Sequence, residues 1–375
     1  MKLSSKLLST SISSLIALTF LATAPSTAQA ATQTWNNAGA TNTWSINALD
    51  ANWLPGNATW ANGNDAAFTN ATGETITVGT NLTIGSITFA AGSGGYTITN
   101  GANTIDINGA GIANNGVSGQ TINSTGIINF NNASSAGNNT SITLSNSGNL
   151  NFNGNSTAGG ANLSINDGQI TFSGTSSAAT STINSSGIVE FLGASTGNSA
   201  NVSNGGTLDI SGHNAGTVTL GSLTNQSPVG NAGAVITGSN KLQVGSLTLS
   251  PFSGNLLDFT LFTAGTSGEI IVGGPFVGAG AGQVTVNITP GAASLTSSVY
   301  DLIDWTTGTA SNVDLTDFAL TSPSGYTSGY ALQINSKKLQ LVKTASVPDG
   351  GNTFFLFGAA VLCLGVIGHR RAANA

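Results

Sequence analysis

A four-residue pattern that ends in a large apolar residue recurs along the middle of the chain, about every twenty residues. The best copies are Ile127–Phe130, Asn149–Phe152, Gln169–Phe172, Ile188–Phe191 and Thr207–Ile210. Their last residues are 22, 20, 19 and 19 positions apart, and a glycine directly precedes every copy. Such a period is typical of repeat architectures, because one repeat cannot bury its apolar face alone and must stack on its neighbours.

Each repeat also contains a second short strand pattern, such as Ser181–Ile183, which follows a polar turn at residues 174–179. This unit suits one rung of a right-handed parallel β-helix, in which rungs stack about 4.7–4.9 Å apart. We therefore predict an all-β fold, a right-handed parallel β-helix or solenoid with Phe and Ile side chains in an internal ladder. A β-sandwich of hairpin-linked strands is the alternative that the residues leave open.

The extent of the repeat suggests the domain organisation. Weaker copies such as Ile84–Phe89 and Val244–Thr248 extend the predicted solenoid to residues 64–255. Residues 256–345 carry longer strand patterns and are predicted to form a small C-terminal β module. This module is either a small sandwich or the last coils of the rod, and it would cover the open sheet edge.

Four of the five tryptophans fall within residues 31–63, at Trp35, Trp44, Trp53 and Trp60. We interpret this segment as an N-terminal cap, because the terminal repeats of a solenoid must close an exposed core. The alternative is an aromatic platform for a polysaccharide, with Trp44 and Trp53 as the candidate glycan contacts.

Residues 1–30 have the three parts of a secretory signal peptide. Lys2 and Lys6 form the basic start, residues 15–22 are apolar, and Ala28 and Ala30 supply small residues for cleavage. The sequence therefore predicts export and processing by signal peptidase.

Residues 346–375 predict a membrane segment with flanking motifs. The order is a short motif (Val347, Pro348, Asp349, Gly350, Gly351), an apolar stretch (354–368) and a basic end (Arg370, Arg371). Fifteen helical residues span about 23 Å, and snorkelling arginines help such a helix to cross a bilayer. We expect one transmembrane helix here, with the arginines on the cytoplasmic side and the rest of the chain outside.

This three-part tail resembles the PEP-CTERM class of sorting signals, in a variant with Val-Pro-Asp at residues 347–349. The resemblance implies that an exosortase-like enzyme processes the protein at the motif. A plain single-pass anchor is the alternative.

A second resemblance covers residues 35 to 255. The spaced tryptophans, Ala67-Phe68 and the Gly-Ser-Ile-Thr-Phe sequence at residues 85–89 look like the autotransporter-associated β-strand repeat proteins. The units around Phe172–Ala178 also resemble passenger domains of large bacterial autotransporters. The resemblance implies a solenoid fold. A true autotransporter would also end in a membrane β-barrel of about 12 strands, and the residues after 255 are too few for one, so self-transport is not supported.

The charge distribution excludes a nucleic-acid binder. Only 6% of the residues are charged, and residues 7–240 contain no Lys or Arg. A protein that binds nucleic acid needs a basic stripe to neutralise phosphates, so we predict no nucleic-acid partner. The single cysteine, Cys363, cannot form a disulfide within one chain.

No pattern of catalytic or metal-ligating residues stands out, so we predict no enzyme activity, no metal and no cofactor. Glu190 and Asp209 lie 19 residues apart, one rung, and are expected to point outward one above the other. Such a pair suits either cation binding or two solvated surface acids. His213 and His369 are the only histidines, so a catalytic serine arrangement has no support.

These features together predict an exported structural or adhesin-like β-repeat protein of the cell surface or the extracellular biofilm matrix. Its membrane contact would be the C-terminal helix, and extracellular polysaccharide is a candidate partner. The alternatives are a polysaccharide-binding module and a β-helix enzyme that degrades polysaccharides. Reducing ends released from polysaccharide would identify the enzyme.

Overall fold

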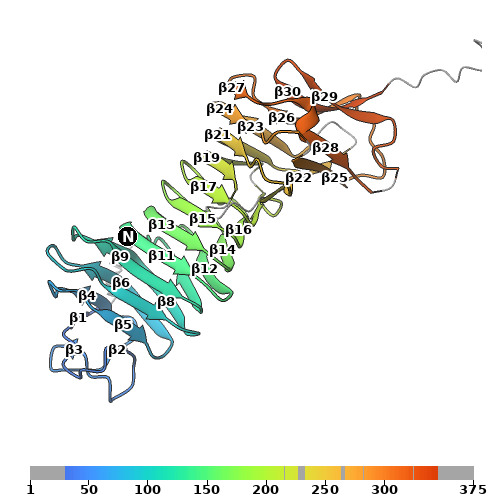
Figure 1. Cartoon of the computed structure of the whole chain (residues 1–375). Coiled ribbons are helices and arrows are strands. Elements are labelled where there is room, and N and C mark those ends of the chain that lie inside the picture. The colour runs from blue at the N-terminus through green and yellow to red at the C-terminus, as the bar shows by residue number, and fades with distance from the viewer. Residues whose placement is uncertain are drawn as a thin grey trace, which may run out of the picture.

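The computed structural model describes residues 30–344, except residues 215, 227–232, 263–266, 282 and 324. The predicted signal peptide and sorting tail therefore lie almost wholly outside the described residues and stay predictions. The described chain is all-β and forms a parallel β-solenoid of about eight turns. Figure 1 shows the rod running from the first strands at one end to β22–β30 at the other.

Two sheets form the long sides of the rod. Sheet A has 14 strands: β3 (Trp53–Leu54), β1 (Thr32–Trp35), β4 (Asp65–Phe68), β6 (Leu82–Phe89), β8 (Thr104–Asn114), β10 (Ile127–Phe130), β12 (Gly148–Phe152), β14 (Gly168–Phe172), β16 (Ile188–Phe191), β18 (Thr207–Asp209), β20 (Ala234–Gly238), β22 (Asn255–Leu261), β25 (Val284–Pro290) and β28 (Phe318–Thr321). Sheet B has 16 strands: β2 (Thr43–Trp44), β5 (Thr75–Val78), β7 (Thr97–Asn100), β9 (Gln120–Ser124), β11 (Asn138–Leu144), β13 (Gly160–Ile165), β15 (Thr182–Ser185), β17 (Asn201–Asn204), β19 (Thr217–Asn225), β21 (Lys241–Leu249), β23 (Glu269–Val272), β26 (Val299–Asp304), β30 (Lys338–Lys343), β29 (Tyr330–Asn335) and, beside this path, β24 (Pro275–Val277) and β27 (Thr309–Ser311). A 3₁₀ turn, η1 (Leu315–Asp317), precedes β28.

Consecutive strands from β4 to β23 alternate between the two sheets, and each strand pairs in parallel with the strand two places away. This connectivity is that of a solenoid, and it excludes the sandwich of hairpin-linked strands. It also confirms that the two strand patterns of each repeat are the two sides of one rung.

The predicted internal ladder is present. Phe130, Phe152, Phe172 and Phe191 are fully buried and occupy equivalent positions on β10, β12, β14 and β16. Their ring centroids are 5.0, 4.9 and 4.9 Å apart, with interplanar angles of 10°, 6° and 11°. The rings stack at about the strand spacing because parallel in-register strands place identical side chains directly above one another.

The glycine before each strand reflects close approach between rungs. A Cβ atom at Gly206 would lie 2.0 Å from the carbonyl oxygen of Gly187, and one at Gly187 would lie 2.3 Å from that of Gly168. Gly168 also has a φ of 112°, a conformation that side chains rarely adopt. The repeated glycines therefore keep neighbouring rungs at hydrogen-bonding distance at this corner.

The N-terminal end is closed by the tryptophans. The indoles of Trp44 and Trp53 have no exposed surface, and Trp35 and Trp60 are 2% exposed. Trp44 and Trp53 lie 5.0 Å apart, and each packs 5.6 Å from Phe68, the first ring below them. Because aromatic side chains bury the largest areas, this cluster covers the end of the apolar interior.

The parallel ladders continue past residue 255. In sheet A, β22 pairs with β25 and β25 with β28, so this part of the segment 256–345 consists of further coils. In sheet B the pattern changes, because β30 pairs antiparallel with β26 and β29 pairs antiparallel with β30. Among the described residues, no helix is long and apolar enough to span a bilayer. The predicted transmembrane segment 354–368 lies beyond them and stays a prediction.

Candidate functional site

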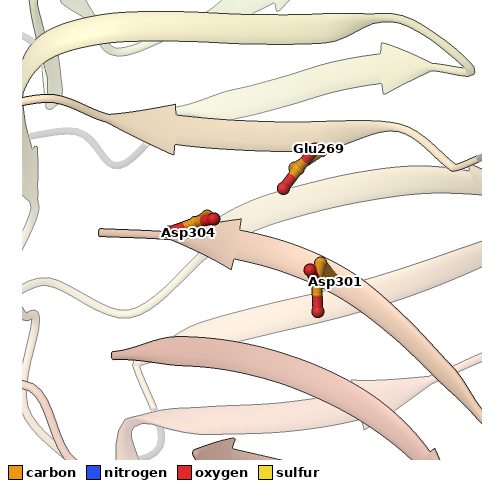
Figure 2. Close-up of side chains that lie close together, drawn as sticks. All are labelled: Glu269, Asp301 and Asp304. Atoms are coloured by element: carbon orange, nitrogen blue, oxygen red, sulfur yellow. The ribbon is translucent and has the colours of Figure 1, made fainter. Parts of the chain in front are cut away.

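The densest group of charged side chains lies where the solenoid meets its C-terminal hairpin. Glu269 begins β23, and Asp301 and Asp304 lie on the neighbouring strand β26 (Figure 2). One carboxylate oxygen from each residue lies within 4.8 Å of the other two. The three residues come from two adjacent strands. Asp301 and Asp304 are three residues apart, and an irregularity in the register between Asp301 and Ile303 lets both side chains point outward on the same face.

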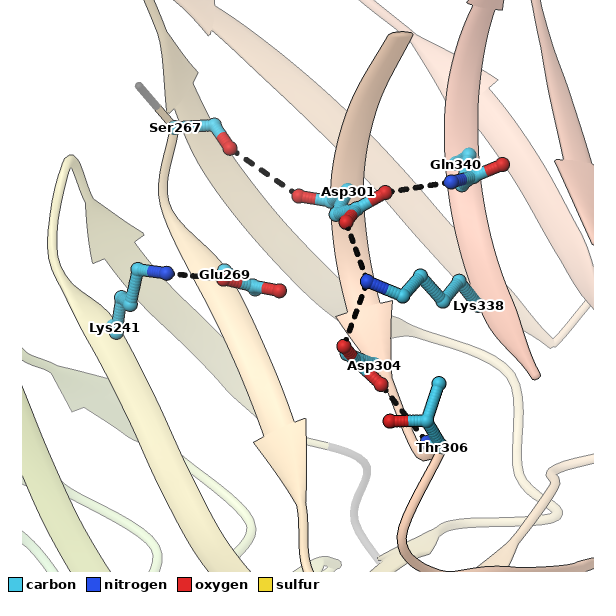
Figure 3. A network of polar contacts seen from close by, with 8 residues as sticks. All are labelled: Lys241, Ser267, Glu269, Asp301, Asp304, Thr306, Lys338 and Gln340. Carbon is cyan, nitrogen blue, oxygen red and sulfur yellow. Dashed lines mark hydrogen bonds and ion pairs between the residues drawn. The ribbon is translucent and has the colours of Figure 1, made fainter. Parts of the chain in front are cut away.

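Two lysines and a glutamine neutralise and orient these carboxylates (Figure 3). The Lys338 ammonium lies 2.7 Å from Asp301 and 2.8 Å from Asp304, which bridges the two aspartates. Gln340 donates a 2.6 Å hydrogen bond to the other oxygen of Asp301. Two of these contacts, Asp301 with Gln340 and Asp304 with Lys338, follow from the register of β26 and β30, in which these residues are direct cross-strand partners.

Glu269 forms the buried part of the cluster. This residue is only 7% exposed, and its carboxylate lies 2.7 Å from the Lys241 ammonium on the adjacent strand β21. Glu269, Asp301 and Lys241 line a hollow of about 700 Å³, together with the hydroxyl-bearing Ser239 and Ser267. The hollow is therefore polar and contains charges of both signs.

The contact with Lys338 favours the ionised form of Asp304. Burial by itself raises the pKa of Asp304, but hydrogen bonds from Lys338 and Thr306 outweigh it and hold that pKa below its ordinary value. Hydrogen bonds to Asp301 and Asp304 raise the pKa of Lys338. At neutral pH Asp304 and Lys338 are therefore both ionised, and their ion pair holds β26 and β30 together.

This arrangement limits what the cluster can do chemically. A general acid for glycoside hydrolysis must keep its proton near neutral pH, whereas Lys338 favours the ionised form of Asp304. Oxygen ligands of this kind suit a hard cation such as Ca²⁺. The Lys338 ammonium already occupies the space between two of the three carboxylates, so we assign the cluster a structural role.

The sequence did not single out these residues. Asp301 and Asp304 fall within the predicted C-terminal β module 256–345, and Lys338 is one of four basic residues between residues 31 and 346. A signal was available, since Lys337-Lys338 contributes two of those four lysines. Nothing in the spacing showed that the last strand folds back beside β26.

The sequence-predicted pair is present but weakly connected. Glu190 and Asp209 are register neighbours on β16 and β18, and both are partly exposed on the outer face of sheet A. Gln169 donates a 2.8 Å hydrogen bond to Glu190, and Asp209 accepts a bond from the backbone of Ser211. The predicted stacking is confirmed, and the contacts favour two solvated surface acids.

The other predicted site residues divide into two groups. Trp44 and Trp53 lie in the interior, so neither indole has a face open to a sugar, and the position of both residues agrees with the cap interpretation. The structure does not test the signal cleavage site or the sorting motif. Ala28, the motif 347–351, Arg370 and Arg371 lie outside the described residues, and Ala30 is the first described residue.

No protein-family model matches the chain, and no curated protein matches it. The fold by itself defines the chain as a parallel β-solenoid protein. This class includes surface and structural β-repeat proteins in general, and the chain fits that broad description.

Proposed function

We propose that the protein is an exported structural or adhesin-like component of the cell surface or the extracellular matrix. The observation that supports this most is the solenoid itself, a rod built from about eight stacked turns of the chain. Backbone ladders and stacked side chains give such a rod its rigidity, because every rung pairs with two neighbours. With 6% charged residues, its surface is mainly uncharged and polar.

The two ends of the sequence support export and sorting. In this proposal the chain is exported, signal peptidase cleaves after Ala30, and the right-handed solenoid folds outside the cytoplasm. An exosortase-like enzyme recognises the motif at residues 347–351, while Arg370 and Arg371 hold the apolar segment in the membrane. The mature protein is either anchored at the surface or released into the matrix.

The proposal includes a non-enzymatic role without a cofactor. Its support is that, in the described part of the chain, the closest group of carboxylates is engaged by Lys241 and Lys338. Among the described residues, the side chains of the partly exposed Glu190 and Asp209 bond only to Gln169 and to the backbone of Ser211, and neither contact differentiates the two acids.

Intact-mass analysis of envelope and medium fractions tests export and sorting. We expect a mass that lacks residues 1–30 and everything after the motif 347–351. A variant that carries Pro348→Ala and Asp349→Ala should keep the tail and accumulate in the membrane fraction. A full-length mass in the cytoplasm would contradict the proposal, and a processed N-terminus with an intact tail in both proteins would identify a plain anchor.

The structural role has a separate test. A deletion strain should change in attachment, aggregation or biofilm texture, and re-expression of the full chain should restore the change. A deletion strain that matches the wild type in all three would remove the support for this role. Reducing ends or unsaturated products released from a polysaccharide panel would instead establish an enzyme.

A further inference from the structure

The outer face of sheet B carries two files of small polar side chains. They occupy alternate positions on nine successive strands of the sheet, β5 to β21. The first file is Thr75, Thr97, Thr121, Ser141, Asn162, Thr182, Asn201, Ser222 and Ser246. The second file is Thr77, Thr99, Asn123, Thr143, Ser164, Asn184, Ser203, Thr224 and Thr248. We call these two files the open face.

The files are regular in both directions. Register pairs such as Thr97 with Thr121 and Thr121 with Ser141 place successive members on adjacent strands, about 4.7–4.9 Å apart. Within one strand the two members are two residues apart, which is about 6.6–6.8 Å. The open face is therefore a two-dimensional array of hydroxyl and amide groups, with its long direction along the rod.

These side chains have unused hydrogen-bonding capacity. Among the described residues, none of the twelve members on β5 to β15 makes a side-chain hydrogen bond to the protein. Further along, Ser222 bonds to Asn201 at 2.7 Å and Ser203 to the carbonyl oxygen of Gln226 at 2.6 Å. The unpaired part of the open face thus covers six consecutive strands.

The opposite face shows that this is not a general property of the rod. On sheet A, Asn129 donates to Asp106 at 2.7 Å, and Asn151 donates to Asn129 at 2.8 Å. A neighbouring file repeats the arrangement, with Asn153 donating to Asn131 at 3.0 Å. Sheet A therefore satisfies many of its outward polar groups internally, whereas β5 to β15 of sheet B leave theirs available.

A shallow hollow of about 330 Å³ lies on the open face. Thr121, Ser141 and Asn162 of the first file line this hollow, and so does Val117, which has 97% of its surface exposed. An exposed apolar side chain next to unpaired hydroxyls suits a ligand that presents both C–H and O–H groups. A pyranose ring has this combination.

We propose that the open face binds a neutral, linear polysaccharide laid along the rod. Eighteen positions carry only Ser, Thr and Asn, so an acidic or basic polymer would find no ion pair there. A neutral polysaccharide repeats hydroxyl donors and acceptors along its length, which matches an array that repeats on every strand. Many weak, regularly spaced hydrogen bonds then act together, as in multivalent binding. The inference deepens the proposed extracellular role and rests on it.

Co-sedimentation of the full-length chain with insoluble cellulose and chitin tests the inference, with anionic alginate beads as a charged probe. The test variant carries Thr97→Val, Thr121→Val and Thr182→Val, which remove hydroxyls from the open face and keep β-branched side chains. The matched control carries Thr83→Val, Thr104→Val and Thr207→Val on the outer face of sheet A. Circular dichroism and thermal unfolding should show that both variants remain folded.

We expect the wild-type chain to sediment with at least one neutral polysaccharide, and this binding to be insensitive to salt. The test variant should bind about tenfold more weakly or worse, since three hydrogen bonds are lost at sites of repeated contact. The control should bind like the wild type. Equal losses in both variants, or binding to alginate alone, would overturn the assignment. Absence of any binding would overturn it too, while a correctly processed surface protein would still support the structural role.

Discussion

Replacing one ring of the phenylalanine ladder should destabilise the rod locally and strongly. Phe152 is fully buried between Phe130 and Phe172, at centroid distances of 5.0 and 4.9 Å. The change Phe152→Ala removes the ring and leaves a cavity that parallel, hydrogen-bonded rungs cannot easily close.

The magnitude follows from burial and stacking. A buried Phe→Ala change costs about 3–5 kcal/mol, and each lost aromatic pair adds about 0.5–1.5 kcal/mol to ordinary burial. Phe152 loses two stacked partners, so we expect the upper half of that range, about 4–5 kcal/mol. Phe252→Ala is the matched control, since Phe252 is 49% exposed and should cost less than about 1 kcal/mol.

Native-state hydrogen exchange is the appropriate assay because solenoids couple mainly between nearest neighbours. Protection should fall in β10, β12 and β14 and stay nearly unchanged in β22 and β25. A uniform loss of protection along the whole rod would refute the nearest-neighbour reasoning. A cost below about 1 kcal/mol for Phe152→Ala would refute the assignment of the ladder as the main source of local stability.

Three further predictions concern the corner, the C-terminal cluster and the surface acids. Gly206→Ala should cost about 2 kcal/mol or more in chemical denaturation, because its Cβ would meet the carbonyl oxygen of Gly187 at 2.0 Å. Because the pKa of Asp304 is lowered in the folded state, its ionised form stabilises the fold above the unfolded pKa of about 3.9. This stabilisation is lost as the pH falls below that value, so the melting temperature of the wild type should fall there. Lys338→Met should destabilise the protein at neutral pH and remove most of this acid dependence; an unchanged profile would rule out the ion pair as its cause. Glu190→Gln should change stability by less than about 0.5 kcal/mol, since the side chain is partly exposed, and a larger loss in the same assay would indicate a bound cation.

The interval between apolar residues was sufficient to predict the repeat. Strands that end at Phe130, Phe152 and Phe172 had to stack in register, because a shift by one residue would turn every ring toward solvent. The glycine before each strand pointed to the same corner. The sequence also indicated that the tryptophans and the C-terminal strands are different from the repeat.

The candidate site and the open face were less accessible to sequence reasoning. Lys338 meets Asp301 and Asp304 only because β30 turns back antiparallel beside β26, across a separation of more than thirty residues. Likewise, Ser, Thr and Asn are so common in this chain that their number does not show which of them face the same way.

The sequence by itself therefore determined the period, the buried ladder and the polar, nearly uncharged character of the rod, because these depend on residue type and spacing. Only the tertiary structure decided which side of each rung belongs to which sheet, and which polar side chains are paired. The physical reason is that register fixes the neighbours of every side chain. On sheet A many of those neighbours satisfy one another, whereas on β5 to β15 of sheet B the described outward side chains make no hydrogen bond to the protein.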